Sequence, residues 1–261
     1  MNFSIHQASH IGNRKYNQDR VAYAYNNDAL LLVLADGMGG HLHGEVAASI
    51  VMDTFVEAFS LLPEISEPMV FLSDTMLCAH QRIMSLPHHE EGQFPGTTCV
   101  AALVQGGRIY WGHAGDSRLY LLRKGQMVLR TLDHSIVQSW LDMGVIDEEE
   151  ARNHPKRNQI TNCLGGVENL FSMEAGASAE LQRGDVVMMC SDGLFAPFLD
   201  KEVASMFQDT PVSSALDRLI AGALTRERGR SDNVTGIAMG WEFGEIVQCN
   251  GKTVSRILEI N

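Results

Sequence analysis

The chain has 261 residues, of which 45% are hydrophobic and only 7 are proline, so it can bury a substantial core in one large domain. Its 32 acidic residues outnumber its 20 basic ones, and the formal net charge of -12 argues against a nucleic-acid surface and against binding to anionic membranes. The longest apolar run, 29–35, is far too short to span a bilayer, and the first ten residues lack the pattern of a signal peptide, so we expect a cytoplasmic protein.

The first half of the chain reads as strands interrupted by a pair of helices. An apolar, β-rich run, LLLVLAD, covers 30–36, and a similar run, IYWGHAGD, covers 109–116. Between them, apolar residues recur at helical spacing over 45–62, and a second helical candidate covers 66–86. These two segments predict a helical hairpin packed on a sheet.

The second half continues the mixture. Residues 119–132 contain two strand-like runs around Lys124-Gly125, which predicts a β-hairpin and therefore antiparallel pairing. Polar residues 135–155 suit an exposed helical excursion, and an amphipathic helix over 212–228 precedes a last strand over 234–241. Strands mixed with helix pairs favour α+β layers over regular βαβ winding.

Aspartates stand at the ends of these strand-like runs, each next to a glycine or another small residue. The four junctions are Asp36-Gly37, Asp116-Ser117, Asp192-Gly193 and Asp232-Asn233. Clustered carboxylates repel one another unless a cation neutralises them, and ligation by oxygen alone favours Mg²⁺ or Mn²⁺. One such junction could equally be a turn or a helix cap. The four together predict a metal site.

The glycine-rich segment ADGMGGHLHGE, residues 35–45, does not match a nucleotide-binding motif. It lacks the GxGxxG spacing, and no GKS or GKT follows a glycine loop, so a dinucleotide site and a P-loop are both disfavoured. Its glycines permit a tight backbone and would let a main-chain carbonyl, such as that of Gly37, approach an ion.

Eight short blocks in fixed order carry a resemblance to a known family. They are RKYNQD (14–19), LADGMGGHLHGE (34–45), GTT (96–98), GHAGDSRLY (112–120), LDHS (132–135), ITNCLGG (160–166), GDVVMMCSDGLF (184–195) and RSDNVTGI (230–237). In this order and over most of the chain, the sequence resembles the metal-dependent protein phosphatases of type 2C, in their compact bacterial form. The resemblance implies a four-layer αββα sandwich, in which helix pairs flank two central antiparallel sheets.

The resemblance also implies a role for each matching residue. Asp36 would bridge two metal ions, and the carbonyl of Gly37 would ligate one of them. Asp192 and Asp232 would ligate the other ion, and Asp19 would support the site, through water or directly. A third, weaker ion would lie at Asp116 and share Asp192. The expected cofactor is therefore Mg²⁺ or Mn²⁺, as two or three ions.

Arg14 and His41 are the other site residues that the resemblance implies. Arg14 stands five residues before Asp19, and its planar fork of donors suits two phosphate oxygens at once. The eukaryotic pattern has histidine two positions after the bridging aspartate, where this chain has Met38. His41 is our candidate for the general acid, although a loop histidine without a role is an equally good interpretation. Gln18 replaces a glutamate that many relatives carry beside Asp19.

The implied reaction is direct hydrolysis of phosphoserine and phosphothreonine esters by metal-activated water, without a phosphoenzyme. The five cysteines do not indicate a cysteine-dependent phosphatase, because none begins a Cys-x5-Arg loop. None forms CxxC, so neither a disulfide framework nor a zinc knuckle is indicated, and we expect reduced thiols. Two alternatives stay open. One is a catalytically silent phosphoprotein-binding module, which would be expected to have lost a site residue, and the other is a hydrolase of small phosphate esters.

The expected organisation is a catalytic domain over 1–241 and a C-terminal extension of unknown role over 242–261, which could add an edge strand or stay mobile. Residues 136–158 fall where the family has its variable flap beside the active site; the acidic run within them could instead be a solvated helix face. The expected partners are phosphorylated proteins and a cognate serine/threonine kinase. We expect a monomer that binds neither nucleic acid nor membrane.

Overall fold

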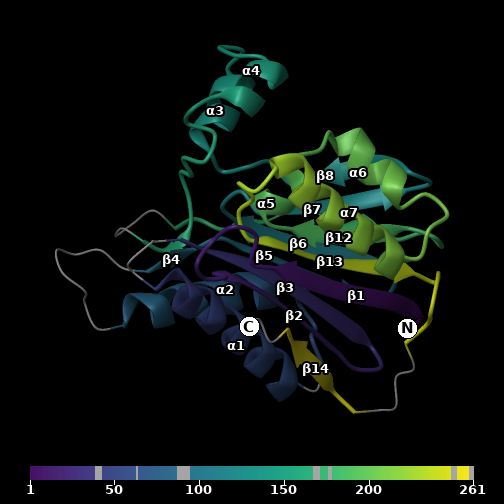
Figure 1. Ribbon diagram of the computed structural model, residues 1–261. Helices are drawn as coiled ribbons and strands as arrows, with labels where there is room; N and C mark the ends of the chain where they lie inside the picture. Colours follow the sequence, from purple (N-terminus) through teal and green to yellow (C-terminus); the bar gives the residue numbers. More distant parts are fainter. Residues whose placement is uncertain are drawn as a thin grey trace.

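The computed structural model describes residues 1–38, 43–62, 64–86, 95–166, 171–175, 178–247 and 252–258. Two β-sheets lie face to face, helices cover the outer face of each sheet, and a small helical hairpin projects from one end (Figure 1). The predicted α+β, four-layer αββα architecture is confirmed, and all the strand pairings are antiparallel, as predicted.

In the part of the chain that the structure describes, the first sheet has five strands, in the order β1-β13-β12-β7-β8. Their bounds are Phe3–His10 for β1, Val234–Trp241 for β13, Val186–Cys190 for β12, Arg118–Arg123 for β7 and Gln126–Arg130 for β8. The predicted hairpin is confirmed as β7 and β8. Its turn residues Lys124 and Gly125 have φ angles of 51° and 72°, a left-handed pair that matches the twist of the two strands.

Within the described residues the second sheet has nine strands, with the central order β10-β6-β5-β3-β2-β14. The bounds are Glu174–Ala175 for β10, Arg108–Ala114 for β6, Cys99–Gln105 for β5, Ala29–Met38 for β3, Asp19–Tyr25 for β2 and Val254–Ile257 for β14. Three short strands lie off this path: β11 (Ala179–Glu180) pairs with β6, and β4 (Gly96–Thr97) pairs with both β3 and β9 (Leu164–Gly165).

Helices α1 (Gly44–Leu61) and α2 (Pro68–Met84) form the predicted hairpin on the second sheet. They bury side chains such as Phe55 and Met76 against it. On the first sheet lie α5 (Asp192–Phe195), α6 (Asp200–Met206) and the predicted amphipathic helix, α7 (Val212–Glu227). A third apolar cluster fills the space between the two sheets. Three cores thus separate four layers, as expected for elements with one apolar face each.

The predicted excursion between residues 135 and 155 contains the hairpin of α3 (Ile136–Asp142) and α4 (Glu148–Asn153), and residues 136–158 are here called the flap. It stands away from the sandwich (Figure 1). Two backbone hydrogen bonds fasten its base: Ile136 N–H donates to Gln159 O at 3.0 Å, and Thr161 N–H donates to His134 O at 2.8 Å. Asp147 caps α4 reciprocally with Glu150, which defines the start of this short helix.

The C-terminal extension adds an edge strand, one of the two outcomes that the sequence left open. Strand β14 pairs with β2, with Val254 opposite Tyr25 and Ile257 opposite Ala22. Of the cysteines in the described residues, Cys78 is exposed, and Cys99, Cys163 and Cys190 are buried; all four are free thiols, as predicted. Among the described residues, no helix has both the length and the apolar character that a membrane crossing requires.

Candidate metal centre

The first two carboxylates of the site face each other across a strand pair. In the register of β2 and β3, Asp19 lies directly opposite Asp36. Asp19 is fully buried; its Oδ2 accepts a hydrogen bond from Ser191 Oγ at 2.8 Å, whereas its Oδ1 has no hydrogen-bond partner among the described residues. Like charges opposite each other destabilise a strand pair, so this arrangement favours a bound cation or a proton held on one of the two carboxyl groups.

The block GTT holds the backbone of Asp36 in place. Thr98 Oγ1 accepts from Asp36 N–H at 2.9 Å, and Thr98 N–H donates to Asp36 O at 2.8 Å. Thr97 Oγ1 donates to the same carbonyl at 3.0 Å. With both main-chain groups of Asp36 satisfied, its carboxylate is fixed at the end of β3.

The other three aspartates reach the same end of the sandwich because neighbouring strands are antiparallel. Strand β12 ends beside the start of β13, with Cys190 opposite Gly236, so Asp192 and Asp232 lie at one edge. A Cβ on Gly193 would lie 2.1 Å from Asn233 O, a close approach that only glycine permits. Asp116 follows β6, where Gly115 turns the chain with a φ of 106°.

The electrostatics confirm that these carboxylates form one group. Burial, followed by the charge of Asp19, raises the pKa of Asp36 well above its usual value. Burial and then the charge of Asp116 do the same for the pKa of Asp192. Burial raises the pKa of Asp19 to about 6 and that of Asp116 to about 7. Asp36 and Asp192 keep partial contact with solvent, as groups on the wall of an open cleft do.

The only cation hydrogen-bonded to one of these five aspartates within the described residues is Arg14, which lies in the loop between β1 and β2. Its Nη2 donates to Asp232 Oδ2 at 2.5 Å, and this hydrogen bond raises the pKa of Arg14. The charges of Asp192 and Asp36 act in the same direction. The guanidinium is therefore directed at the carboxylate cluster, as its predicted role requires.

One amide side chain fixes this loop to the last strand. Asn233 Oδ1 accepts from Gln18 N–H at 2.8 Å, while Asn233 Nδ2 donates to Ile11 O at 2.8 Å and to Tyr16 O at 3.0 Å. Asn233 is only 5% exposed. It thereby sets the position of the loop that carries Arg14 relative to Asp232.

The donor set fits hard divalent ions. It consists of carboxylate oxygens, and Mg²⁺ and Mn²⁺ prefer such ligands. One of them, Asp19 Oδ1, is buried and has no hydrogen-bond partner among the residues that the structure describes. Among the described residues, however, no three His, Cys, Asp or Glu side chains already surround one point as metal ligands. Asp232 is engaged by Arg14, and ligation by it would require this ion pair to rearrange.

The structure brings Asp19, Asp36, Gly37, Asp116, Asp192, Asp232 and Arg14 to one end of the sandwich. His41 lies outside the described residues. His43 is described, and its Nδ1 lies 3.2 Å from Glu45 Oε1. Gln18 Nε2 donates to Glu45 at 3.3 Å, so the residue that replaces a glutamate is a donor to a neighbouring carboxylate.

Sequence reasoning missed three supporting residues: Thr98, Ser191 and Asn233. Each lies inside one of the eight sequence blocks of the family, and its side chain was assigned no role from the sequence. The signal was present in GTT, CSD and SDN, but hydrogen bonds between segments far apart in the sequence cannot be assigned from spacing alone.

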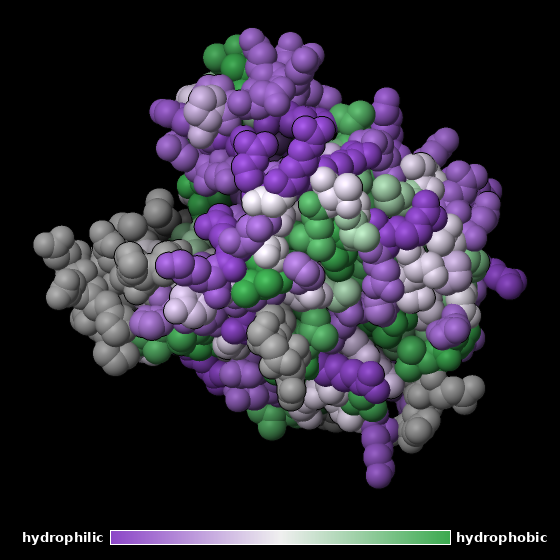
Figure 2. Space-filling view, viewed as in Figure 1, coloured by the Kyte–Doolittle hydropathy of each residue, from purple (hydrophilic) through white to green (hydrophobic). Residues whose placement is uncertain are grey.

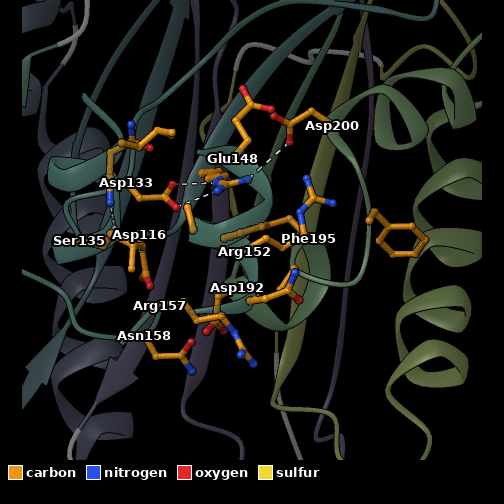
Figure 3. Close-up of a pocket in the computed structure, with 18 of the residues that line it drawn as sticks. Asp116, Asp133, Ser135, Glu148, Arg152, Arg157, Asn158, Asp192, Phe195 and Asp200 are labelled. Atoms are coloured by element: carbon orange, nitrogen blue, oxygen red, sulfur yellow. Dashed lines mark hydrogen bonds and ion pairs between the residues drawn. The ribbon is translucent and has the colours of Figure 1, made fainter. Parts of the chain in front are cut away.

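A pocket of about 320 Å³ opens beside the carboxylates, between the flap and helices α5 and α6. Asp116, Asp192, Phe195 and Asp200 form part of its wall (Figure 3). Flap residues, among them Glu148 and Arg152, line the opposite side. The cluster therefore borders a cavity that a ligand could enter from the flap side.

Comparison with known proteins places these features in a family. Residues 6–228 match the family model described as Protein phosphatase 2C. The chain is 36% identical over 240 residues to the serine/threonine protein phosphatase PstP of Mycobacterium tuberculosis, an alignment that covers 89% of this chain and 44% of PstP. The chain thus spans less than half the length of that relative.

Two solved structures are similar over nearly their whole length. The serine/threonine phosphatase of S. agalactiae aligns with a TM-score of 0.82 and 30% identity, covering 91% of this chain and 99% of that one. The catalytic domain of PstP in complex with two manganese ions aligns with a TM-score of 0.74 and 30% identity, covering 95% and 99%.

Proposed function

Because the chain belongs to the protein phosphatase 2C family, we propose that it is a metal-dependent phosphatase of phosphoserine and phosphothreonine in proteins. The observation that carries the proposal is the convergence of five strand-end aspartates and Arg14 at one end of the sandwich. A catalytically silent binding module is not favoured, because each of these residues is retained.

The residues that would hold the metal ions are those that the resemblance assigned. Asp36 would bridge two ions, the Gly37 carbonyl would complete one of them, Asp192 and Asp232 would hold the other, and Asp19 would support the site. Asp116, with Asp192, would hold a third. When bound, Mg²⁺ or Mn²⁺ would supply a water made nucleophilic near neutral pH and positive charge against the phosphate. The manganese complex of the similar catalytic domain supports this choice of ion.

Residues of the chain itself would orient the substrate phosphate and the metal-binding carboxylates. Arg14 would exchange its hydrogen bond with Asp232 for two hydrogen bonds to phosphate oxygens, since its fork matches their spacing. Asn233 keeps the loop in position during this exchange. Thr98 and Ser191 fix Asp36 and Asp19, so the carboxylates need not reorganise as charge develops on the phosphate. His41 remains our prediction for the group that protonates the leaving alkoxide.

We further propose that the substrates are phosphorylated proteins and that a serine/threonine kinase provides them. A monomeric state and a cytoplasmic location stay predictions from the sequence. Hydrolysis of small phosphate esters is the competing activity; the open pocket beside the cluster favours a peptide substrate.

The decisive experiment measures phosphate release from a phosphothreonine peptide with Mn²⁺, with EDTA, and with Asp192→Ala in Mn²⁺. Turnover that requires metal and is abolished by the substitution would support the proposal. A folded protein that releases no phosphate with any divalent ion would instead indicate the silent binding module. Faster turnover of p-nitrophenyl phosphate than of the peptide would favour the small-ester hydrolase.

A further inference from the structure

Four arginines line the pocket between the flap and the sandwich, and two of them are fully engaged. Arg118 donates two hydrogen bonds of 2.7 Å to the carboxylate of Asp133, and its guanidinium lies 3.7 Å above the ring of Phe195. Arg130 pairs with Asp200 at 2.9 Å. These two arginines and two aspartates balance in charge and form the floor of the pocket.

Arg152 and Arg157, the other two, belong to the flap and are differently placed. Both are exposed, and within the described part of the chain neither guanidinium forms a hydrogen bond or an ion pair. Glu148 precedes Arg152 by one helical turn and also lines the pocket, yet no ion pair joins the two side chains. In Figure 3 the side chains of Arg152 and Arg157 project into the pocket that Asp192 borders.

On a molecule with a net charge of -12, these two arginines place positive charge beside a pocket that the aspartate cluster borders. Hydrophilic side chains cover most of the visible surface of the flap, so this face is suited to a charged ligand rather than an apolar one (Figure 2). A guanidinium binds carboxylate and phosphate in the same bidentate way. The pocket volume of about 320 Å³ lies at the lower end of ligand sites and suits one or two residues of a peptide.

We propose that Arg152 and Arg157 form a second anion subsite, which binds a carboxylate or an additional phosphate on a residue near the phosphorylated one. This inference rests on the proposed function, because it assumes that the first phosphate lies at the aspartate cluster. It specifies a substrate class: phosphoproteins whose phosphorylation site is flanked by acidic or phosphorylated residues.

The test compares kcat/KM for three sets of phosphothreonine peptides. In each peptide one position, up to three residues before or after the phosphothreonine, is varied. The three sets carry Ala, Glu or phosphoserine at that position. The wild type is expected to prefer the best acidic peptide over the matching Ala peptide by roughly ten-fold, and phosphoserine more than Glu because of its greater charge. In the double variant Arg152→Gln/Arg157→Gln this ratio should fall to about two or less. Each variant is normalised to its own Ala peptide.

Lys156→Gln is the matched control, because it removes one positive charge from the flap outside the pocket. Lys156 Nζ lies 5.8 Å from the centre of the Trp140 ring and does not line the cavity. The control should keep the preference of the wild type, whereas Glu148→Gln should increase it. A wild type without preference, a double variant that retains it, or a Lys156→Gln variant that loses it equally would overturn the proposal.

A binding measurement separates this proposal from the proposed function. Fluorescence anisotropy of labelled peptides in EDTA needs no turnover and reports the acidic preference directly. If no protein releases phosphate, but the wild type binds acidic peptides more tightly than the double variant does, the subsite stands and the catalytic assignment fails. Turnover without any difference in binding or kcat/KM between the two proteins would contradict the subsite alone.

Discussion

At the scale of single residues, the guanidinium of Arg14 is the group proposed to bind the substrate phosphate. It already faces three aspartates of the cluster and is 60% exposed, so it is accessible to a ligand. We predict that Arg14→Ala lowers kcat/KM for a phosphopeptide by on the order of 10- to 100-fold, and that Arg14→Lys recovers only part of it, because lysine keeps the charge but not the fork. Steady-state kinetics would measure this effect.

Metal affinity is the control for that prediction. Arg14 competes with a cation for Asp232, so removing it should leave Mn²⁺ affinity unchanged or slightly tighter. Titration calorimetry on both Arg14 variants tests this. A marked loss of Mn²⁺ binding would mean that Arg14 supports the metal site rather than the phosphate.

Asn233 is the second residue at this scale, because a single side chain makes three hydrogen bonds to the loop of Arg14. We predict that Asn233→Ala lowers the free energy of unfolding by roughly 2–4 kcal/mol, since it removes three buried hydrogen bonds to main-chain groups of this loop. Urea unfolding measures this loss. Ser231→Ala, which removes one hydrogen bond to Asn13 in the same segment, should cost much less.

At the scale of elements, β14 covers the edge of the strand that begins at Asp19. Val247, Val254 and Leu258 pack against the core between the sheets, and Leu258 N–H donates to Val21 O at 3.0 Å. Since β14 lies outside the matched residues 6–228, it extends the sheet beyond the part of the chain that the family model covers.

We predict that deleting residues 248–261 lowers the free energy of unfolding by about 1–3 kcal/mol, through lost apolar burial, and increases aggregation through the exposed edge of β2. Chemical unfolding and light scattering are the measurements. Turnover per folded molecule should be nearly unchanged, because the aspartates keep their partners. Val254→Ser, which keeps the backbone pairing, should show a smaller loss of stability without aggregation.

At the scale of the whole molecule, the concentration of buried carboxylates at one end of the sandwich couples stability to pH and metal. Burial raises the pKa of Asp19 to about 6 and that of Asp116 to about 7, from 3.8. The folded, metal-free protein thus holds protons that the unfolded chain has released. The stability from these groups is complete below the unfolded pKa and is lost as pH rises through the folded values.

We therefore predict that the Tm of the protein in EDTA falls between about pH 5 and pH 8, and that Mn²⁺ raises the Tm more at about pH 8 than at about pH 5. Differential scanning calorimetry at fixed ionic strength measures both. The variant Asp116→Asn should show a smaller decrease of the Tm with rising pH in EDTA. A Tm that rises over this pH range in EDTA would contradict the electrostatic account of the cluster. So would a Tm that Mn²⁺ leaves unchanged at both pH values.

The sequence by itself determined the layers and the identity of the acidic residues. Apolar periodicity distinguishes the helical spacing of 45–62 from the strand-like run at 30–36, and Lys124-Gly125 predicts the turn of the hairpin between β7 and β8. These features are local, because they depend on the backbone preferences of neighbouring residues. The aspartates were visible for the same reason: a carboxylate that directly follows a buried strand stands out in the pattern.

Only the tertiary structure decided which groups meet. The register that places Asp19 opposite Asp36, the three hydrogen bonds of Asn233, and the contrast between the engaged Arg118 and the uncommitted Arg152 all join segments distant in the chain. The pairing of β14 with β2, rather than a mobile tail, was decided in the same way. Such contacts depend on packing between layers, and periodicity within a segment carries no information about the partner that it will face.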